Sequence, residues 1–271
     1  AFSTGPGIFS QNNFQSKEEA IGLMKRYRDH YRTRNLKSYI AGNRKQRNYI
    51  VQAAHELGMM PTTEGALDLK LDLTHAIDAF HGNEHNFPVT PLYKDVIELV
   101  AQSGMTYTPT LLVTYGGPWA ENYYYATEEV HDDPKVKRFV PDNIIQSKTR
   151  RVPWFRKDEY AFTEIAADAA KIIKAGGLVG VGGHGQLNGL GYHWELWSLH
   201  SGGMTEMEAL RAATINGAKI IGVSNDVGSI EYGKLADYEY VEDACDNLLV
   251  CYDENEVEME KIAKIQFFEK T

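Results

Sequence analysis

Four residues whose side chains could bind a metal ion or transfer a proton fall at the ends of short apolar runs: Lys37, Glu64, His85 and His184. If these runs are parallel strands, their carboxyl ends share one edge of a sheet, where such folds place their active sites. Lysine rarely lies in a protein interior without a partner, and carboxylation of Lys37 would turn its amine into a carbamate with oxygen ligands. Imidazole and carboxylate groups suit divalent transition metals. Each residue alone has an ordinary structural explanation, and their recurrence at successive strand ends favours a site.

Other histidines compete for these roles. His75 falls in a predicted helix, where it is expected to pack or cap, and His81 falls in a loop. His193 starts an aromatic-rich helix and is expected to pack on the neighbouring strands, and His200 remains open. The glycine-rich run at 182–186 lacks the lysine and hydroxyl residue of a phosphate-binding loop, which argues against a nucleotide site.

Strands and helices alternate along the first 200 residues. This alternation is typical of a parallel α/β fold, and the chain offers about six β/α units where a closed barrel has eight. Apolar periodicity and glycine stops predict strands over residues 35–41, 59–64, 82–85, 106–114 and 178–182, and helices over 44–57, 69–80, 92–103 and 160–175.

One long segment interrupts this alternation. Residues 116–154 are rich in aromatic side chains, including Trp119 and Tyr123 to Tyr125, and they follow the carboxyl end of a predicted strand. Long loops in this position usually shape or cover an active site. We therefore expect the segment to form walls of the substrate pocket, the alternative being a surface excursion held together by its own aromatic residues.

The pattern changes after residue 200. Thr205 and Glu208 form a capping-box signature at the start of a helix predicted over 205–216. Turn residues then lead to predicted strands over 238–241 and 248–252 and a charged, helical tail over 254–268. This change divides the chain into a main domain, residues 1–222, and a smaller C-terminal part, residues 223–271.

Composition limits the classes of partner. The chain is 43% hydrophobic and 24% charged, which is ordinary for a globular protein, and its net charge of -9 argues against nucleic acid. No stretch approaches the roughly 18 consecutive apolar residues of a membrane span. Cys245 and Cys251 have neither the number for a disulfide framework nor the spacing of a zinc motif. A small-molecule substrate is the remaining expectation, and the compartment is not indicated.

Two stretches carry a family resemblance. GGMTEMEALRAATINGA at 202–218 looks like the helix after the last barrel strand of amidohydrolases, and GSIEYGKLAD at 228–237 resembles the turn into their small β-sandwich. The likeness extends over about residues 1–237 and is strongest to the imidazolonepropionase-like branch, including members fused to TolB-type β-propellers. The resemblance implies a (β/α)8 TIM barrel with a β-sandwich remnant at the C-terminus.

The resemblance also assigns roles to the four candidates. Lys37 matches the lysine of barrel strand four, the carbamate bridge of many relatives, and His85 matches the histidine ligand of strand six. Glu64 stands where most members have a strand-five histidine, and His184 stands where most have the aspartate that serves as general base. These matches imply a divalent metal, zinc being expected, held by Lys37, Glu64, His85 and His184.

A further departure concerns the beginning of the barrel. Amidohydrolases carry an H-x-H pair on barrel strand one, and the sequence contains no H-x-H. Residues 2–5 resemble barrel strand three, so the chain is expected to be incomplete at its N-terminus and to hold about strands three to eight. An open parallel sheet has unpaired edges, and we expect a complementing N-terminal chain or a homo-oligomer to close it.

The leading hypothesis is a hydrolase that cleaves an amide or cyclic-amide C–N bond with metal-activated water. His184 would act as the catalytic proton carrier, because a histidine titrates near neutral pH. Tyr39, Tyr115 and Gln186 are expected to contact the substrate. The alternative is a catalytically incomplete subunit or fragment that serves in binding or assembly.

The charge of the lysine leads to one more expectation. Without carboxylation, the Lys37 amine is a cation that repels a divalent ion and pairs with Glu64 instead. We therefore expect the chain by itself to bind metal weakly or not at all.

Overall fold

The computed structural model describes residues 3–9, 11–150, 153–185 and 187–235. Its centre is a sheet of four parallel strands that lie side by side in the order in which they occur along the chain. A helix lies between each strand and the next, so the predicted parallel α/β fold is confirmed. The strands are β1 (Asn35–Lys37), β2 (Met60–Thr63), β3 (Gly82–Glu84) and β4 (Thr106–Thr108).

One further segment joins each edge of this sheet through a single parallel bridge. Ile8 bridges Ser38 beside β1, and Val179 bridges Tyr107 of β4. The Ile8 N–H donates to the carbonyl of Lys37 at 2.8 Å. Among the described residues, no strand pairs with the outer side of either edge segment, so this part of the chain does not close the sheet.

Three predicted strands differ from the observed ones. The N-terminal edge pairs at Ile8, the fully buried apolar residue of this segment, and the described residues of the stretch predicted over 2–5 form no strand. The strand predicted over 178–182 is reduced to one bridge, since its glycines offer no side chains for packing. The strand predicted over 106–114 ends at Thr108, and a short 3-10 helix, η2 (Leu111–Val113), follows it.

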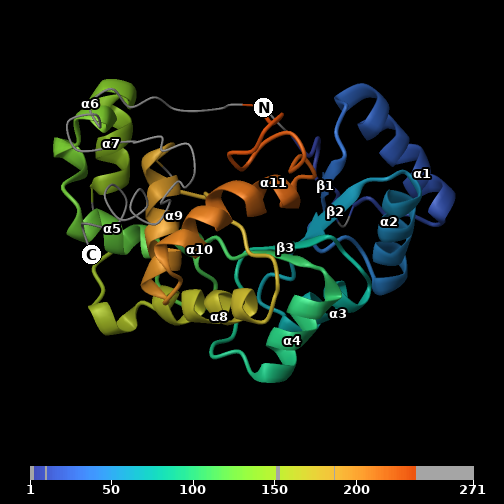
Figure 1. The fold of residues 1–271 in the computed structure, drawn as a ribbon, viewed down its shortest axis with the longest axis horizontal. Coiled ribbons are helices and arrows are strands. Elements are labelled where there is room, and N and C mark those ends of the chain that lie inside the picture. The colour runs from blue at the N-terminus through green and yellow to red at the C-terminus, as the bar shows by residue number, and fades with distance from the viewer. Residues whose placement is uncertain (1–2, 10, 151–152, 186, 236–271) are drawn as a thin grey trace.

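The helices between the strands cover one face of the sheet. In Figure 1, α3 (Leu69–Ile77), α4 (Lys94–Ser103) and α8 (Phe162–Lys174) lie along one side of the sheet, and α11 (Gly217–Ile220) crosses the other side. The four helices predicted between strands are present as α2 (Arg44–Glu56), α3, α4 and α8. The other helical segments are α1 (Lys17–Arg26), η1 (Tyr27–Tyr31), α5 (Ala120–Thr127), η3 (Val130–Asp132), α6 (Pro134–Phe139), α7 (Asp142–Thr149), η4 (Lys157–Glu159), α9 (Leu190–Ser201), α10 (Glu206–Arg211) and η5 (Ala212–Asn216).

Strand alternation separates an apolar face from a polar one. Leu36 of β1 is buried in one apolar cluster with Ile50 of α2. Its neighbours Asn35 and Lys37 point to the opposite face, because successive side chains of a strand alternate, and both line a cavity there. A second apolar cluster, with Tyr107 among its members, joins β4 to α4, α8 and α9. The helix side is therefore the hydrophobic core, and the other face is left for polar residues.

The described part of the segment over 116–154 contains the helices α5, α6 and α7, which corrects the expectation of a long loop. Tyr123 and Tyr124 pack on the main body, whereas Trp119 and Trp154 are exposed. Tyr124 stacks on Trp194 of α9 at 5.2 Å between ring centroids, and Tyr123 contacts Phe162 of α8 at 5.4 Å. Because these rings are used for packing, none of them lines the cavity on the polar face, and the expected substrate walls are not formed by them.

The C-terminal part is described only as far as residue 235. Thr205 caps α10 through the predicted capping box with Glu208, and the helix continues through a π-helical turn, η5, into α11. The predicted strands over 238–241 and 248–252, the tail helix and both cysteines lie outside the described residues, as does most of the predicted sandwich remnant. Within the described ranges, no helix has the length and apolar character needed to cross a membrane.

Candidate active site at the carboxyl ends of the strands

Glu64, the residue after β2, is the centre of a polar cluster. Its side chain is buried, with 5% of the residue exposed. The Lys37 ammonium donates to Glu64 Oε2 at 2.5 Å, and the Tyr115 hydroxyl donates to Glu64 Oε1 at 3.2 Å. Both carboxylate oxygens are therefore occupied, one by a cation and one by a neutral donor. Burial and the nearby Glu64 charge raise the pKa of Tyr115, so its hydroxyl stays protonated and donates.

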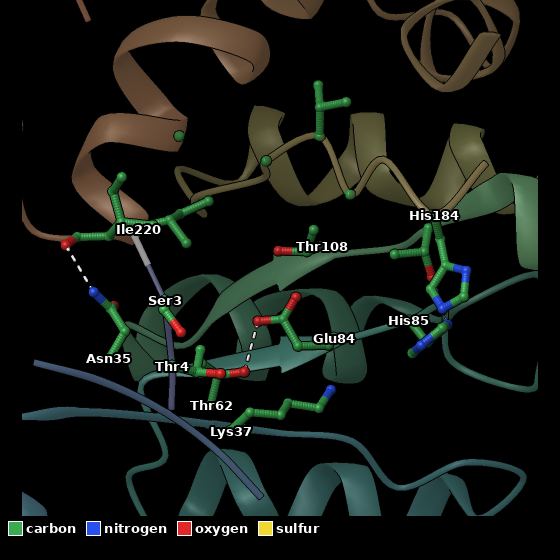
Figure 2. Close-up of a pocket in the computed structure, with 16 residues that line it drawn as sticks. Ser3, Thr4, Asn35, Lys37, Thr62, Glu84, His85, Thr108, His184 and Ile220 are labelled. Atoms are coloured by element: carbon green, nitrogen blue, oxygen red, sulfur yellow. Dashed lines mark hydrogen bonds between the residues drawn. The ribbon is translucent and has the colours of Figure 1, made fainter. Parts of the chain in front are cut away.

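His85, the residue after β3, lies on the other side of Glu64. Its Nε2 is 3.4 Å from Glu64 Oε2, and its Nδ1 is 2.6 Å from the hydroxyl of Thr110. Desolvation by burial lowers the pKa of His85 despite the nearby Glu64 charge, so the ring is neutral at neutral pH. The ring of His184 lies 5.2 Å from the ring of His85, on an exposed loop. The two histidines stand together at one end of the cavity in Figure 2.

The backbone bends sharply where each strand ends. One residue shortly after each of the four strands has positive φ without being glycine: Ile40, Ala66, His85 and Thr110. Left-handed conformations of this kind are unfavourable for side chains with a Cβ and persist where the surrounding contacts enforce them. For His85 and Thr110, this conformation belongs to the residues that carry the polar contacts of the site.

Buried carboxylates from the helix side hold two of these turns. Asp72 of α3 accepts a hydrogen bond from the Gly65 N–H at 2.7 Å, directly after Glu64. Glu195 of α9 accepts from the N–H groups of Leu111 and Leu112 at 2.5 and 2.9 Å, directly after Thr110. Burial raises the pKa of Asp72 to about 7 and that of Glu195 to about 8. Residue 65 must be glycine, because a Cβ there would collide with the Asp72 carboxylate.

A cavity of about 430 Å³ runs along the polar face of the sheet below these turns. Glu84 lines it and accepts a hydrogen bond from the Thr62 hydroxyl at 2.6 Å. Figure 2 shows the histidines at one end of the cavity, and Asn35 near Ile220 at the other. The Asn35 side chain donates to the carbonyl of Ile221 at 3.2 Å, which ties the chain after α11 across that end. The chain after α11 thus covers the end of the cavity that lies away from the histidines.

The structure brings most of the predicted site residues together. Lys37, Glu64 and His85 are in contact, and His184 adjoins His85. Tyr115 joins them through its hydrogen bond to Glu64. Tyr39 and Gln186 complete the predicted set and need separate description.

Tyr39 is placed differently from the other predicted substrate contacts. Its ring packs edge-on against Phe9 at 6.1 Å and is 37% exposed, and it does not line the cavity. Gln186 lies outside the described residues. Of the predicted substrate contacts, Tyr115 alone is therefore placed in the cluster, where it binds Glu64.

The competing histidines lie away from the cluster. His75 is buried in α3 against Phe80, and burial lowers its pKa to about 4. His81 Nε2 is 3.0 Å from the carbonyl of Ile220, at the covered end of the cavity. His200 is hydrogen bonded near the end of α9.

Sequence reasoning missed four polar residues of this region: Asp72, Glu84, Thr110 and Glu195. Glu84 stands beside the end of a predicted strand and could have been found by extending the strand-end rule to the neighbour of His85. Thr110 falls inside the strand predicted over 106–114, which ends earlier at Thr108, so no strand-end signal marked it. Glu195 lies between two tryptophans in an apolar stretch, a placement that signals a paired or hydrogen-bonded buried charge. The Asp72 contact has no comparable signal.

The cluster offers donors that suit a divalent ion, though incompletely. Glu64 and His85 present an oxygen and a nitrogen 3.4 Å apart, compatible with two ligands of one ion at bond lengths of about 2 Å. Among the described residues, no group of three histidine, cysteine or acidic side chains lies close enough to enclose an ion. The Lys37 ammonium occupies the Glu64 oxygen that faces His85, so metal binding there requires Lys37 to lose its charge.

Comparison with known proteins identifies the family. The profile described as Amidohydrolase family matches residues 46–268, and the chain belongs to this family. Its members generally use divalent metals. No curated protein matches the chain significantly.

Solved structures share the fold. A Xaa-Pro dipeptidase with bound methionine has 20% identity and a TM-score of 0.53, over 82% of this chain and 52% of that chain. A molinate hydrolase has 16% identity and a TM-score of 0.54, over 81% and 48%. The A. niger ochratoxinase has 19% identity and a TM-score of 0.53, over 83% and 48%. The chain therefore spans about half the length of these structures.

Proposed function

We propose that the chain carries part of the active site of a metal-dependent hydrolase that cleaves an amide or cyclic-amide C–N bond in a small molecule. The convergence of Lys37, Glu64, His85 and His184 at one sheet edge is the observation that supports this. The names of similar structures, a dipeptidase and an ochratoxinase among them, favour substrates of this class.

In this proposal, Glu64, His85 and His184 hold a divalent ion, zinc in the first instance, together with a carboxylated Lys37. When bound, the ion would supply an activated water and polarise the scissile carbonyl. The chain's own residues have three tasks. Tyr115 orients Glu64 through the hydrogen bond from its hydroxyl, and Thr110 orients His85. His184, which is exposed at one end of the cavity, carries the proton to the leaving nitrogen.

We further propose that the fold is a (β/α)8 TIM barrel of the imidazolonepropionase-like branch. The six parallel segments from Ile8 to Val179 would be about strands three to eight, with residues 223–271 as the sandwich remnant. A complementing chain or a second copy would pair with the open edges of this sheet. The one-sided pairing of Ile8 and Val179 among the described residues supports a closing partner.

The test is zinc calorimetry combined with metal analysis of natively purified material. The isolated chain is expected to bind zinc weakly or not at all, because the Lys37 cation faces the ligands. The natively purified protein is expected to contain the metal and to hydrolyse N-acyl amino acids or dipeptides. Lys37→Ala and His85→Ala should both abolish that activity. Sub-micromolar zinc binding by the isolated chain, lost in His85→Ala, would instead show a self-sufficient metal site.

A second candidate function follows from the ion pair between Lys37 and Glu64. This pair neutralises the Glu64 carboxylate without any metal, as expected of a subunit that serves in binding or assembly. Native material without metal and without hydrolysis, in which Lys37→Ala weakens association with a partner, would favour this candidate over the hydrolase.

A further inference from the structure

Glu195 is a buried acid whose oxygens contact only the backbone. It is completely buried in α9, and its two oxygens accept the N–H groups of Leu111 and Leu112. Among the described residues, no cationic side chain pairs with it. A carboxyl group without a cation is expensive to bury, so a residue of this kind needs a compensating role.

The two N–H groups belong to the turn that presents Thr110. Thr110 has a φ of 49°, and η2 begins with the next residue. The Thr110 hydroxyl lies 2.6 Å from Nδ1 of His85, whose own φ is 66°. The opposite ring nitrogen of His85, Nε2, faces Glu64 at 3.4 Å. A continuous series of contacts thus leads from the interior of α9 to the reactive face of the site.

We infer that Glu195 is a positioning residue: by holding the turn at Leu111 and Leu112, it keeps the Thr110 hydroxyl as a donor to Nδ1 of His85. The Glu64 carboxylate accepts at Nε2, so the tautomer with the proton on Nε2 is favoured. The hydrogen bond made by one imidazole nitrogen determines the state of the other. Glu195 thereby keeps Nε2 directed at Glu64. The consequence for hydrolysis rests on the proposed function, whereas the control of the His85 tautomer does not.

Asp168 provides a matched comparison. This carboxylate is also buried and comes from a neighbouring helix, α8, where it pairs with Lys171 at 2.7 Å. It accepts from the N–H of Leu92 at 3.0 Å and from the Thr90 hydroxyl at 2.8 Å, again in a turn between a strand and a helix. None of these contacts leads to His85, so loss of the Asp168 charge should affect stability and leave the His85 ring unchanged.

The experiment is nitrogen-15 NMR of the histidine side chains in the full chain, at a pH above about 8, where the His85 ring is neutral and Glu195 is ionised. The probes are Glu195→Gln, Thr110→Val, Thr110→Ser and the control Asp168→Asn. In Glu195→Gln, the new side chain would present an amide NH2 to one of the two N–H donors, so the turn should loosen without a change in side-chain size.

The wild type is expected to show one His85 tautomer. Thr110→Val and Glu195→Gln should each shift the tautomer ratio about fivefold, the equivalent of one neutral hydrogen bond. Thr110→Ser, which keeps the hydroxyl, should restore the wild-type ratio, and Asp168→Asn should retain it. Adding Glu195→Gln to Thr110→Val should change the ratio no further, since both act through the same bond.

An unchanged tautomer in a folded Glu195→Gln protein would overturn the inference and leave Glu195 as a structural cap. If Glu195→Gln does not fold, Glu195→Asp keeps both oxygens and the charge but is one methylene shorter, and the same tautomer shift is expected. A single wild-type tautomer in folded Glu195→Asp would equally overturn the inference. A shifted tautomer in protein that lacks hydrolase activity would instead count against the proposed function alone.

Discussion

Glu64 and Glu195 are both buried glutamates of one site, and their surroundings differ completely. Glu64 lies at the carboxyl end of β2, and its carboxylate is bound by the side chains of Lys37 and Tyr115, beside His85. Glu195 lies behind the turn and is bound by two backbone N–H groups. Side-chain partners can move, change charge or exchange for a ligand, whereas backbone N–H groups cannot.

The two glutamates also differ in what happens to their partners when the glutamate is removed. The partly exposed Lys37 can be solvated if Glu64 is removed, since 27% of its side chain is accessible. The N–H groups of Leu111 and Leu112 have no such escape, because both residues are fully buried. The contacts of Glu64 at the strand ends can therefore change, whereas the contacts of Glu195 with the turn behind them are fixed.

The largest expected effect concerns stability. Glu195→Ala should lower the free energy of unfolding by about 3 kcal/mol or more, because it leaves two buried donors unpaired. Glu64→Ala should cost only about 1 kcal/mol, since its lysine partner can reach water. Urea unfolding of the two variants measures both values. Equal losses of stability in the two variants would contradict the distinction between the exchangeable contacts of Glu64 and the fixed contacts of Glu195.

The pH dependence of stability gives the next effect. Burial raises the pKa of Glu195 to about 8 and that of Asp72 to about 7. The folded protein therefore holds protons that the unfolded chain has already released, and the free energy of unfolding should fall as the pH rises through this range. The slope is about 1.4 kcal/mol per pH unit for each proton.

Unfolding measured between about pH 7 and pH 8.5 tests this sign. Burial lowers the pKa of His75 to about 4, and an unfolded histidine titrates near 6.5, so His75 contributes little in that window. Glu195→Gln should flatten most of the curve, and Asp72→Asn should flatten it only near pH 7, because Asp72 has released most of its proton above that pH. Curves parallel to wild type in both variants would contradict the assignment.

The smallest expected effect concerns the hydroxyl of Tyr115. Tyr115→Phe removes one neutral donor from Glu64 Oε1 and keeps the ring against His85, so stability should fall by about 0.5 to 1 kcal/mol. Any hydrolysis by native material should fall more than stability does, because Glu64 loses its orientation. A loss of stability comparable to that of Glu195→Ala would instead indicate that Tyr115 has a structural role like that of Glu195.

The sequence by itself determined the alternation of the fold and the main site candidates. Apolar periodicity located the strands and helices, because burial against one face imposes a repeat on the chain. Lys37, Glu64 and His85 were found because parallel strands bring their carboxyl ends to one edge whatever the loops do. The helices within 116–154 were missed, since aromatic residues there are equally compatible with a loop that lines a substrate pocket and with a helix face that packs on the protein.

Only the tertiary structure decided which groups touch. The distance in sequence from His85 to Thr110, and from Thr110 to Glu195, carries no periodic signal, because these contacts join different elements. The left-handed turn at Thr110 is likewise held by a contact from the helix behind it, where Glu195 of α9 accepts from Leu111 and Leu112, rather than by residue type. A strand end can be located from local pattern, whereas the orientation of its side chain depends on buried partners that fold against it from elsewhere in the chain.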